Sequence, residues 1–292
     1  MNQPEPVDEL LIGISTDRQE LLGILARPGA GAPGQATAVV IVVGGPQTRV
    51  GSHRQFVLLA RALAGAGYPC LRFDYTGMGD SPGPRPDFEA AGEDIRRACD
   101  AVLAAEPGCR RIALWGLCDG ATAAAFHAVA DERVIAVIAA NPWARSDSTR
   151  SAALVQSHYG SRLRSGEFWR KLASGRIDVI AAATEAIGHA RRARGAARAR
   201  HREPTGPVDL PSRLASALQG IRTTLRLQLS GRDLTAAEFE VAMKASGVFE
   251  LASASALRLP EADHTFSNPD ALAAVIDDTL AVLRRATRMC ES

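Results

Sequence analysis

The apolar positions of the chain fall into short runs of two kinds that alternate. Continuous runs rich in branched residues predict strands buried on both faces, and they cover Thr37–Val43, Tyr68–Tyr75, Arg111–Leu117, Val134–Ala140, Leu225–Leu229 and Ala256–Leu259. Runs with apolar residues every three or four positions predict helices, and they cover Gln55–Ala66, Phe88–Ala105, Ala121–Ala130, Ala236–Ala245 and Pro269–Thr287. Strands that alternate with helices predict an α/β fold whose mostly parallel sheet has helices on both faces.

Two segments depart from this alternation. Glu9–Ser15 and Glu20–Arg27 are short apolar runs around a polar turn, which predicts an antiparallel hairpin. Between Ala144 and Pro207 the alternation stops and only helical stretches are predicted, which favours a helical insertion at 144–207 in a core formed by 1–143 and 208–292. The insertion contains an arginine-rich part, made up of Arg191, Arg192, Arg194, Arg198, Arg200 and Arg202. We interpret it as a solvated surface segment, with an acidic partner or acyl carrier as the alternative.

Composition narrows the class of protein. A chain of 292 residues with 46% hydrophobic and 23% charged residues is typical of a globular protein. A formal net charge of +2 gives no reason to expect nucleic acid as a partner. The start of the chain, Met1–Asp8, is polar rather than signal-like, and we expect no membrane span because no apolar run reaches ~18 residues. Five scattered cysteines without CxxC spacing favour a reducing, cytoplasmic location.

The segment 114–120, Leu-Trp-Gly-Leu-Cys-Asp-Gly, joins a predicted buried strand to a predicted helix. A strand, a tight turn and a helix form the context of a nucleophile elbow, and Cys118 stands at the position of the nucleophile. Gly116 and Gly120 supply the small residues that so sharp a turn needs. A helix that begins at Asp119 would point its N-terminus at Cys118 and favour a thiolate. The alternative is that Cys118 is simply a small buried hydrophobe.

A cysteine nucleophile needs a base, and the base needs an acid to orient it. His264 lies in a loop after the last short strand, and Asp233 directly follows the strand at 225–229. Both would lie at the carboxyl edge of the sheet, in the chain order nucleophile, acid, histidine. Asp233 could instead serve only as a helix cap. Asn141 stands at an alternative acid position but carries no charge.

An oxyanion hole needs two backbone N–H groups. We expect one from Asp119 and the other from Gly45 or Gln47, because Pro46 between them has no N–H. Gln47 is preferred, since Pro46 should push Gly45 into an extended conformation.

Arg49 and His53, in the loop that follows, are candidate contacts for an anionic substrate group or ordinary surface residues. Trp143, at the end of the strand 134–140, is a further candidate substrate contact. Gly77 and Gly79 follow a strand, but Pro82 replaces the third glycine of a dinucleotide fingerprint. We therefore predict no cofactor and no metal.

The elbow, the turn Asp-Tyr-Thr-Gly-Met-Gly-Asp-Ser at 74–81 and the late pair Asp263-His264 resemble the α/β-hydrolase superfamily. This resemblance implies a sheet of about eight strands, and it implies that the helical insertion at 144–207 is a lid. The stretch Gly-Gly-Pro-Gln-Thr-Arg-Val-Gly-Ser-His-Arg-Gln at 44–55, with Arg-Phe-Asp-Tyr at 72–75 and Trp-Gly-Leu-Cys-Asp at 115–119, is similar to the exosortase A system-associated hydrolase 1 family. That family implies a bacterial operon for exopolysaccharide and protein sorting, but no established substrate.

These residues predict a Cys118–His264–Asp233 triad that acts on a small-molecule ester or thioester, free or carrier-bound, through an acyl-cysteine. The same intermediate could pass its acyl group to an amine or thiol, so acyl transfer stays open beside hydrolysis. The competing classes are a non-catalytic binding protein on the same fold and a structural partner of membrane export machinery. The sequence leaves the oligomeric state open.

Overall fold

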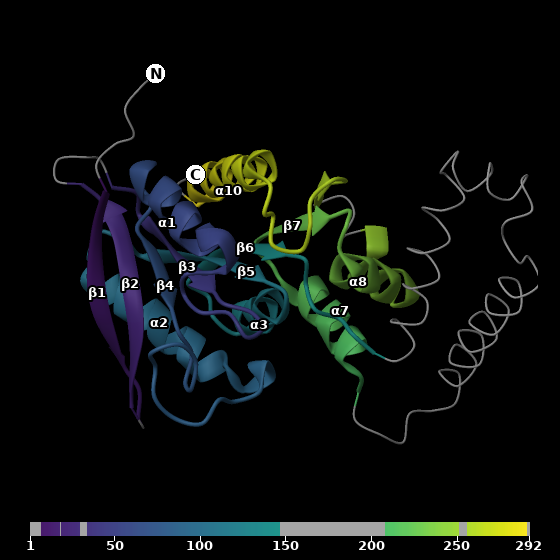
Figure 1. Ribbon diagram of the computed structural model, residues 1–292, viewed down its shortest axis with the longest axis horizontal. Helices are drawn as coiled ribbons and strands as arrows, with labels where there is room; N and C mark the ends of the chain where they lie inside the picture. Colours follow the sequence, from purple (N-terminus) through teal and green to yellow (C-terminus); the bar gives the residue numbers. More distant parts are fainter. Residues whose placement is uncertain (1–6, 18, 30–33, 147–207, 251–255, 291–292) are drawn as a thin grey trace, which may run out of the picture.

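The computed structural model describes residues 7–17, 19–29, 34–146, 208–250 and 256–290. The predicted lid at 144–207 lies outside the described residues from 147 onward, and so does its arginine-rich part. The described residues form one layered α/β unit (Figure 1).

An eight-stranded sheet forms the middle layer. Its strands are β1 (Val7–Ser15), β2 (Glu20–Pro28), β3 (Thr37–Val42), β4 (Cys70–Phe73), β5 (Arg111–Leu117), β6 (Val134–Ala140), β7 (Thr224–Ser230) and β8 (Ala256–Leu259). Their order across the sheet is β1-β2-β4-β3-β5-β6-β7-β8, and only β2 runs antiparallel to its neighbours. The prediction of a mostly parallel sheet of about eight strands is confirmed, and the Val134 and Leu225 strands pair side by side within it.

Helices cover both faces of this sheet (Figure 1). One face carries α1 (Gln55–Gly65) and α10 (Pro269–Met289), which contact each other. The opposite face carries α2 (Gly92–Ala105), α3 (Asp119–Ala128) and α7 (Leu210–Gly220), and α8 (Leu234–Ala245) packs against α7. Two short 3₁₀ turns, η1 (Ser52–Arg54) and η2 (Phe88–Ala90), precede α1 and α2.

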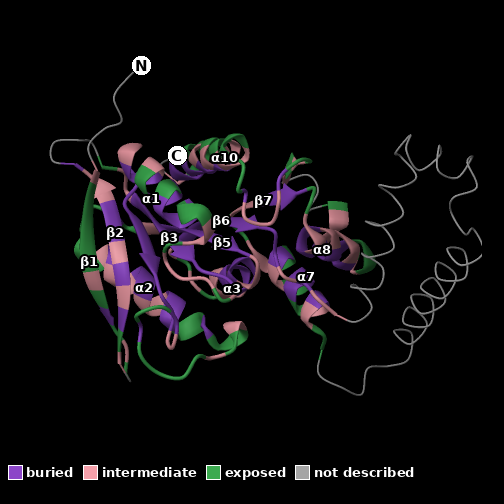
Figure 2. Ribbon diagram, viewed as in Figure 1, coloured by how far each residue is buried: buried purple, intermediate pink, exposed green. Residues whose placement is uncertain are grey.

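The central strands are buried along their length (Figure 2). Every residue of β3 and β6 is buried, and so is every residue of β5 after Arg111. This explains why their sequences are continuous apolar runs rather than alternating ones. The largest buried side chain, Trp115 of β5, contacts the Phe56 ring edge-on and donates from Nε1 to Gln228 Oε1 at 3.0 Å. The strand ends beside Cys118 therefore rest on a tightly packed support.

Most of the predicted boundaries are accurate, and the differences have local causes. The predicted helix 88–105 is divided, because the Asp87 carboxylate caps η2 by accepting the Glu89 N–H at 3.1 Å and a separate helix begins at Gly92. Helix α7 was not predicted. Its sequence signal is an Asp209 N-cap, which accepts the Ser212 N–H at 3.1 Å, with a proline in the first turn. Within the described ranges, no helix is both long and apolar enough to cross a membrane.

Candidate active site

Cys118 stands at the turn between β5 and α3, in a backbone conformation that residues other than glycine rarely adopt. Its φ is 60° and its ψ is −127°. The turn is held by hydrogen bonds on both sides: Cys118 N–H donates to Ala140 O at 3.0 Å, and Cys118 O accepts the N–H groups of Ala121 and Trp143 at 3.1 Å. Strain of this kind persists only where the surroundings impose it, and it clusters at functional sites.

The two flanking glycines explain how the chain can turn so sharply. A Cβ at Gly116 would lie 2.6 Å from Gly120 O and 2.7 Å from the Ala121 Cα. A Cβ at Gly120 would lie 2.4 Å from Val42 O. Both contacts are with backbone atoms, which cannot move aside cheaply, so helix α3 reaches strand β3 only because these residues lack side chains.

The structure brings Asp233 and His264 into contact. Asp233 Oδ2 lies 2.8 Å from His264 Nδ1, and the carboxylate also caps α8 by accepting the N–H groups of Thr235 and Ala236, each at 3.1 Å. Asp233 is therefore a helix cap that also contacts the His264 ring, while its role as the orienting acid stays a prediction. Its side chain is 7% exposed and that of His264 is 31% exposed.

Cys118 is the second side-chain hydrogen-bond partner of His264. Burial lowers the pKa of His264, but the hydrogen bonds to Asp233 and Cys118 and the charges of both outweigh it and raise this pKa to about 10. The imidazole is therefore charged near neutral pH, between an aspartate on one side and the sulfur on the other. This pairing is the arrangement that activates a cysteine nucleophile.

Asn141 fixes the loop that carries His264, a role that the sequence analysis missed when it considered this residue only as an acid. Asn141 Nδ2 donates to His264 O at 3.0 Å and to Ser230 Oγ at 2.9 Å, while its Oδ1 accepts the Ser230 N–H at 2.8 Å. Ser230 Oγ in turn donates to Asp263 O at 2.7 Å. The ends of β6 and β7 and the histidine loop are thus joined through one fully buried amide.

The predicted oxyanion donors need one correction. The N–H of Gly45 points toward the elbow and donates to the Asp119 side chain, and Gly45 has a φ of 62° rather than the extended conformation expected before Pro46. The Gln47 side chain accepts the Ser52 N–H at 3.2 Å and faces its own loop. The conformational argument against Gly45 is therefore wrong, and Gly45 stays a candidate for the donor that accompanies the Asp119 N–H.

Arg49 does not offer its charge to a ligand. Its guanidinium forms an ion pair with the fully buried Asp74 and a second one with Asp80 at 2.6 Å, and its N–H donates to Asp74 Oδ1 at 2.6 Å. The side chain is 15% exposed. Arg49 therefore neutralises a buried carboxylate and holds the 74–80 turn against the loop after β3, so the expectation that it binds an anionic substrate group is not supported.

His53 and Trp143 both lie near the elbow and the histidine loop. Burial raises the pKa of Asp263, but hydrogen bonds from Ser267 lower it overall, and the nearby exposed His53 adds to the lowering. His53 therefore lies near the residue that precedes His264. The backbone of Trp143 binds the Cys118 carbonyl, and its half-buried ring lies 4.2 Å from the guanidinium carbon of Arg145. Contact of either residue with a substrate stays a prediction.

Among the residues that the structure describes, one cluster outside this site holds possible metal-ligating atoms. Those of Cys99, His127 and Asp131 lie within 4.8 Å of one another. However, Arg133 donates to both carboxylate oxygens of Asp131, at 2.9 and 2.7 Å, and so places a positive charge within the cluster. Burial also raises the pKa of Cys99 to about 12, which keeps its sulfur protonated. The cluster is a charge network rather than a site suited to a cation.

The sharp elbow, the parallel sheet and the histidine loop at its carboxyl edge define a hydrolase fold with a nucleophile-elbow site. The sequence profile of the alpha/beta hydrolase family matches residues 39–275, and the chain belongs to this family. The family assignment makes it a hydrolase. No curated protein matches the chain in sequence.

Solved structures with the same fold include several esterases. An esterase of Pyrococcus furiosus superposes with a TM-score of 0.62 at 16% identity, covering 95% of this chain and 90% of that one. A Rhizomucor miehei esterase gives a TM-score of 0.61 at 15% identity, with 98% and 86% covered. A dienelactone hydrolase of Anabaena variabilis gives 0.57 at 18% identity, with 94% and 95% covered. At these identities the likeness establishes the fold.

Proposed function

We propose that this hydrolase cleaves esters or thioesters through an acyl-cysteine intermediate, with Cys118 as nucleophile, His264 as base and acid, and Asp233 as the residue that orients the imidazole. The observation that carries the proposal is the unbroken hydrogen-bonded series from Asp233 through His264 to Cys118 at the strained elbow. The esterases and the dienelactone hydrolase that share the fold are consistent with this substrate class.

In the proposed mechanism each step is carried by a named atom. The Cys118 sulfur, having given its proton to the ring of His264, attacks the carbonyl carbon, and a carbon–sulfur bond forms. The negative charge moves to the carbonyl oxygen, where the N–H groups of Gly45 and Asp119 would stabilise it. The intermediate collapses, the bond to the leaving oxygen or sulfur breaks, and the leaving group takes the proton from His264. Water, deprotonated by the same ring, then attacks the thioester. The carbon–sulfur bond breaks, the carboxylic acid leaves, and the sulfur takes the proton back from His264.

Two finer parts of the proposal rest on the sequence. We assign the family context to the exosortase-associated hydrolases on the segment 44–55, and we assign residues 144–207 to a lid over the site. An acyl-cysteine also reacts with amines and thiols, so a lid that excluded water would favour transfer over hydrolysis. The substrate is a small acyl donor, either free or attached to a carrier.

The test is intact-mass detection of an acyl group on the protein after brief exposure to a panel of esters and thioesters. We expect one acyl addition per chain, located on Cys118 by peptide mapping, and its loss in Cys118→Ala. His264→Ala should slow its formation by orders of magnitude. Chasing the adduct with water or with an added amine or thiol distinguishes hydrolysis from transfer.

A matched control comes from the other cysteines. Cys290 is also half-buried and free, so Cys290→Ser should leave the adduct unchanged. Acylation that persists in Cys118→Ala, or that distributes over several cysteines, would contradict the proposal.

A further inference from the structure

The Asp119 carboxylate lies among the N–H groups that should bind the oxyanion. It accepts the Gly45 N–H, and the N–H groups of Gly120 and of Asp119 itself are also its hydrogen-bond partners. Gly44 makes this approach possible, since a Cβ there would lie 2.7 Å from Asp119 Oδ1 and 2.9 Å from Gly120 N. The two donors assigned to a tetrahedral intermediate are therefore already engaged by the side chain next to the nucleophile.

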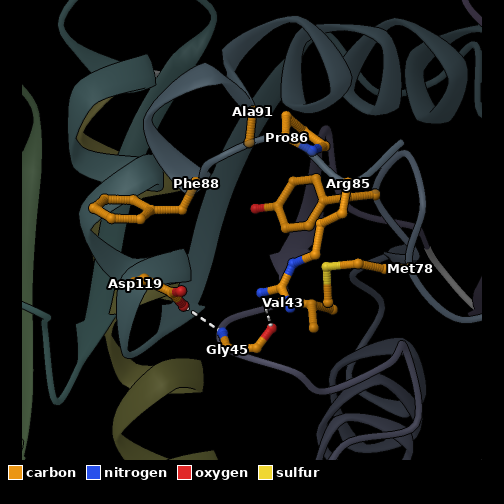
Figure 3. A pocket seen from close by; sticks show the side chains of 9 residues that line it. Val43, Gly45, Met78, Arg85, Pro86, Phe88, Ala91 and Asp119 are labelled. Carbon is orange, nitrogen blue, oxygen red and sulfur yellow. Dashed lines mark hydrogen bonds between the residues drawn. The ribbon is translucent and has the colours of Figure 1, made fainter. Parts of the chain in front are cut away.

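A small pocket lies directly beside this carboxylate (Figure 3). It is lined by Val43, Gly45, Tyr75, Met78, Arg85, Pro86, Phe88, Ala91 and Asp119. Arg85 Nη2 donates to Gly45 O at 2.9 Å, so the guanidinium borders the same peptide segment whose N–H holds Asp119. The arginine is exposed and its partner is a neutral carbonyl, so its charge is available to a carboxylate in the pocket.

The Tyr75 hydroxyl supplies a second polar group in this pocket. The ring is buried, and its hydroxyl oxygen has no hydrogen-bond partner among the described residues. Burial and the negative charges of Asp119 and Asp94 raise the pKa of Tyr75, so the hydroxyl stays protonated as a donor. An unpartnered buried donor is costly, which indicates that this hydroxyl has a partner in another state of the site.

We propose that the Asp119 side chain is a movable occupant of the oxyanion hole, which a substrate carbonyl must displace, and that Arg85 and Tyr75 receive the carboxylate when it leaves. This inference rests on the proposed function, because it concerns the hole that the acylation step uses. Acyl donors without further contacts to the protein must compete with a carboxylate held by three N–H groups, so they react slowly. The residue therefore selects for substrates whose remaining part is bound elsewhere in the site.

Protonation of Asp119 should weaken its hold on the hole. Burial raises the pKa of this carboxyl, against the lowering effects of its backbone hydrogen bonds and of Arg85. The charged and titratable groups that face it are Arg85 from the loop before η2 and Tyr75 from the loop after β4, with Asp94 of α2 beyond the tyrosine. Once protonated, the group loses the negative charge on which its hydrogen bonds depend.

The experiment compares two reactions of the same sulfur. Acylation by p-nitrophenyl acetate develops an oxyanion, whereas alkylation by iodoacetamide is a substitution at a saturated carbon and needs no oxyanion hole. The acylation rate divided by the alkylation rate therefore reports on the oxyanion hole and is independent of thiolate formation. We expect Asp119→Ala to raise this ratio about tenfold or more, since a single oxyanion donor is worth about 10²–10³ in rate. In the wild type the ratio should rise as the pH falls, and in Asp119→Ala it should stay flat.

Arg85→Met tests the second position of the carboxylate. It should lower the ratio in the wild type and leave it unchanged in an Asp119→Ala background, because the arginine acts only through the aspartate. A ratio that falls or does not change in Asp119→Ala would overturn the proposal and would mean that the carboxylate assists acylation or does not obstruct it. Asp119→Asn keeps the side-chain shape at the first turn of α3 and should give an intermediate ratio, so it serves if the alanine variant does not fold.

A measurement without substrate separates this proposal from the proposed function. In the NMR spectrum of the full chain, the Gly45 amide proton should titrate with the Asp119 carboxyl and should lose that titration in Asp119→Ala. If neither the wild type nor Asp119→Ala is acylated, but the Gly45 amide of the wild type shows this titration, the acyl-cysteine chemistry is refuted while the occupancy of the hole is upheld. An amide shift that is the same in both proteins, at every pH, would refute the occupancy itself.

Discussion

Replacing Asp233 by asparagine tests the triad most directly, because this carboxylate both contacts the His264 ring and caps α8. Its Oδ1 accepts the Thr235 N–H, and its Oδ2 accepts both the Ala236 N–H and the His264 ring N–H. Asparagine keeps only one acceptor oxygen. If that oxygen takes the Oδ1 place and accepts the Thr235 N–H, the amide NH₂ faces His264 Nδ1 and forces the ring into the tautomer whose other nitrogen already carries a proton. Such a ring cannot accept a proton from Cys118.

The magnitudes of the two effects differ. Loss of the orienting carboxylate in a Ser-His-Asp triad lowers turnover by about 10⁴, and we expect a loss of about 10³–10⁴ in the acylation rate here. The cost in stability is small, because asparagine is nearly as good an N-cap as aspartate; Asp233→Ala, which removes the cap as well, should cost about 1 kcal/mol more. Acylation is followed by rapid quench and mass spectrometry, and the unfolding free energy by urea titration.

Asp209 provides the matched control. It caps α7 just as Asp233 caps α8, by accepting the Ser212 N–H at 3.1 Å. Asp209→Ala should therefore lose about 1 kcal/mol of stability with no loss of acylation. Acylation that survives in Asp233→Asn, or that falls equally in Asp209→Ala, would refute the assignment of the orienting role to Asp233.

Three further outcomes follow from the same contacts. Gly120→Ala should destabilise the protein by several kcal/mol and abolish acylation, since its Cβ would lie 2.4 Å from Val42 O; thermal melts test this, and an unchanged melting temperature would contradict it. Asn141→Ala should cost about 1–3 kcal/mol and slow acylation, because it leaves the Ser230 N–H and His264 O without their partner; an active, fully stable variant would refute its positioning role. The interactions that raise the pKa of His264 stabilise the fold fully below pH ~6.5, the pKa of a histidine in the unfolded chain, and this stabilisation is lost as the pH rises to about 10. Urea midpoints that rise over this pH interval by more in the wild type than in His264→Ala would contradict the sign.

The parts of this protein that the sequence predicts well are those fixed by periodicity and chain order. The buried runs gave strands with nearly the observed bounds, because residues enclosed on both faces of a sheet have few alternatives to apolar side chains. The loops after β5, β7 and β8 meet at one edge because parallel strands end together, so Cys118, Asp233 and His264 could be chosen before any distance was known.

The directions of individual side chains were not predictable in the same way. Arg49 and Asp74 lie 25 positions apart, and nothing in the local sequence pattern indicates that the buried aspartate forms an ion pair with the arginine. The link from Asn141 to His264 spans 123 positions and depends on where two strand ends come to rest. Helix α7 was overlooked for a different reason. Its start, Asp-Leu-Pro, is a local sequence signal for a helix N-terminus, but it directly follows a segment in which strands and helices do not alternate.

Gly45 and Asp119 show why backbone chemistry and side-chain chemistry must be read together. The sequence analysis treated both as sources of N–H groups, and it chose between Gly45 and Gln47 from the conformational effect of Pro46 alone. Glycine escapes that effect because a φ of 62° costs it little, and its N–H consequently points at the elbow. There it donates to the carboxylate of Asp119, the residue whose own N–H is the second proposed donor. A carboxylate that occupies the oxyanion hole disfavours a negatively charged oxygen there until the carboxylate moves away or is protonated. The residue after the nucleophile, whose side chain the motif leaves unspecified, is therefore the position at which members of one fold can differ in reactivity without any change to the triad.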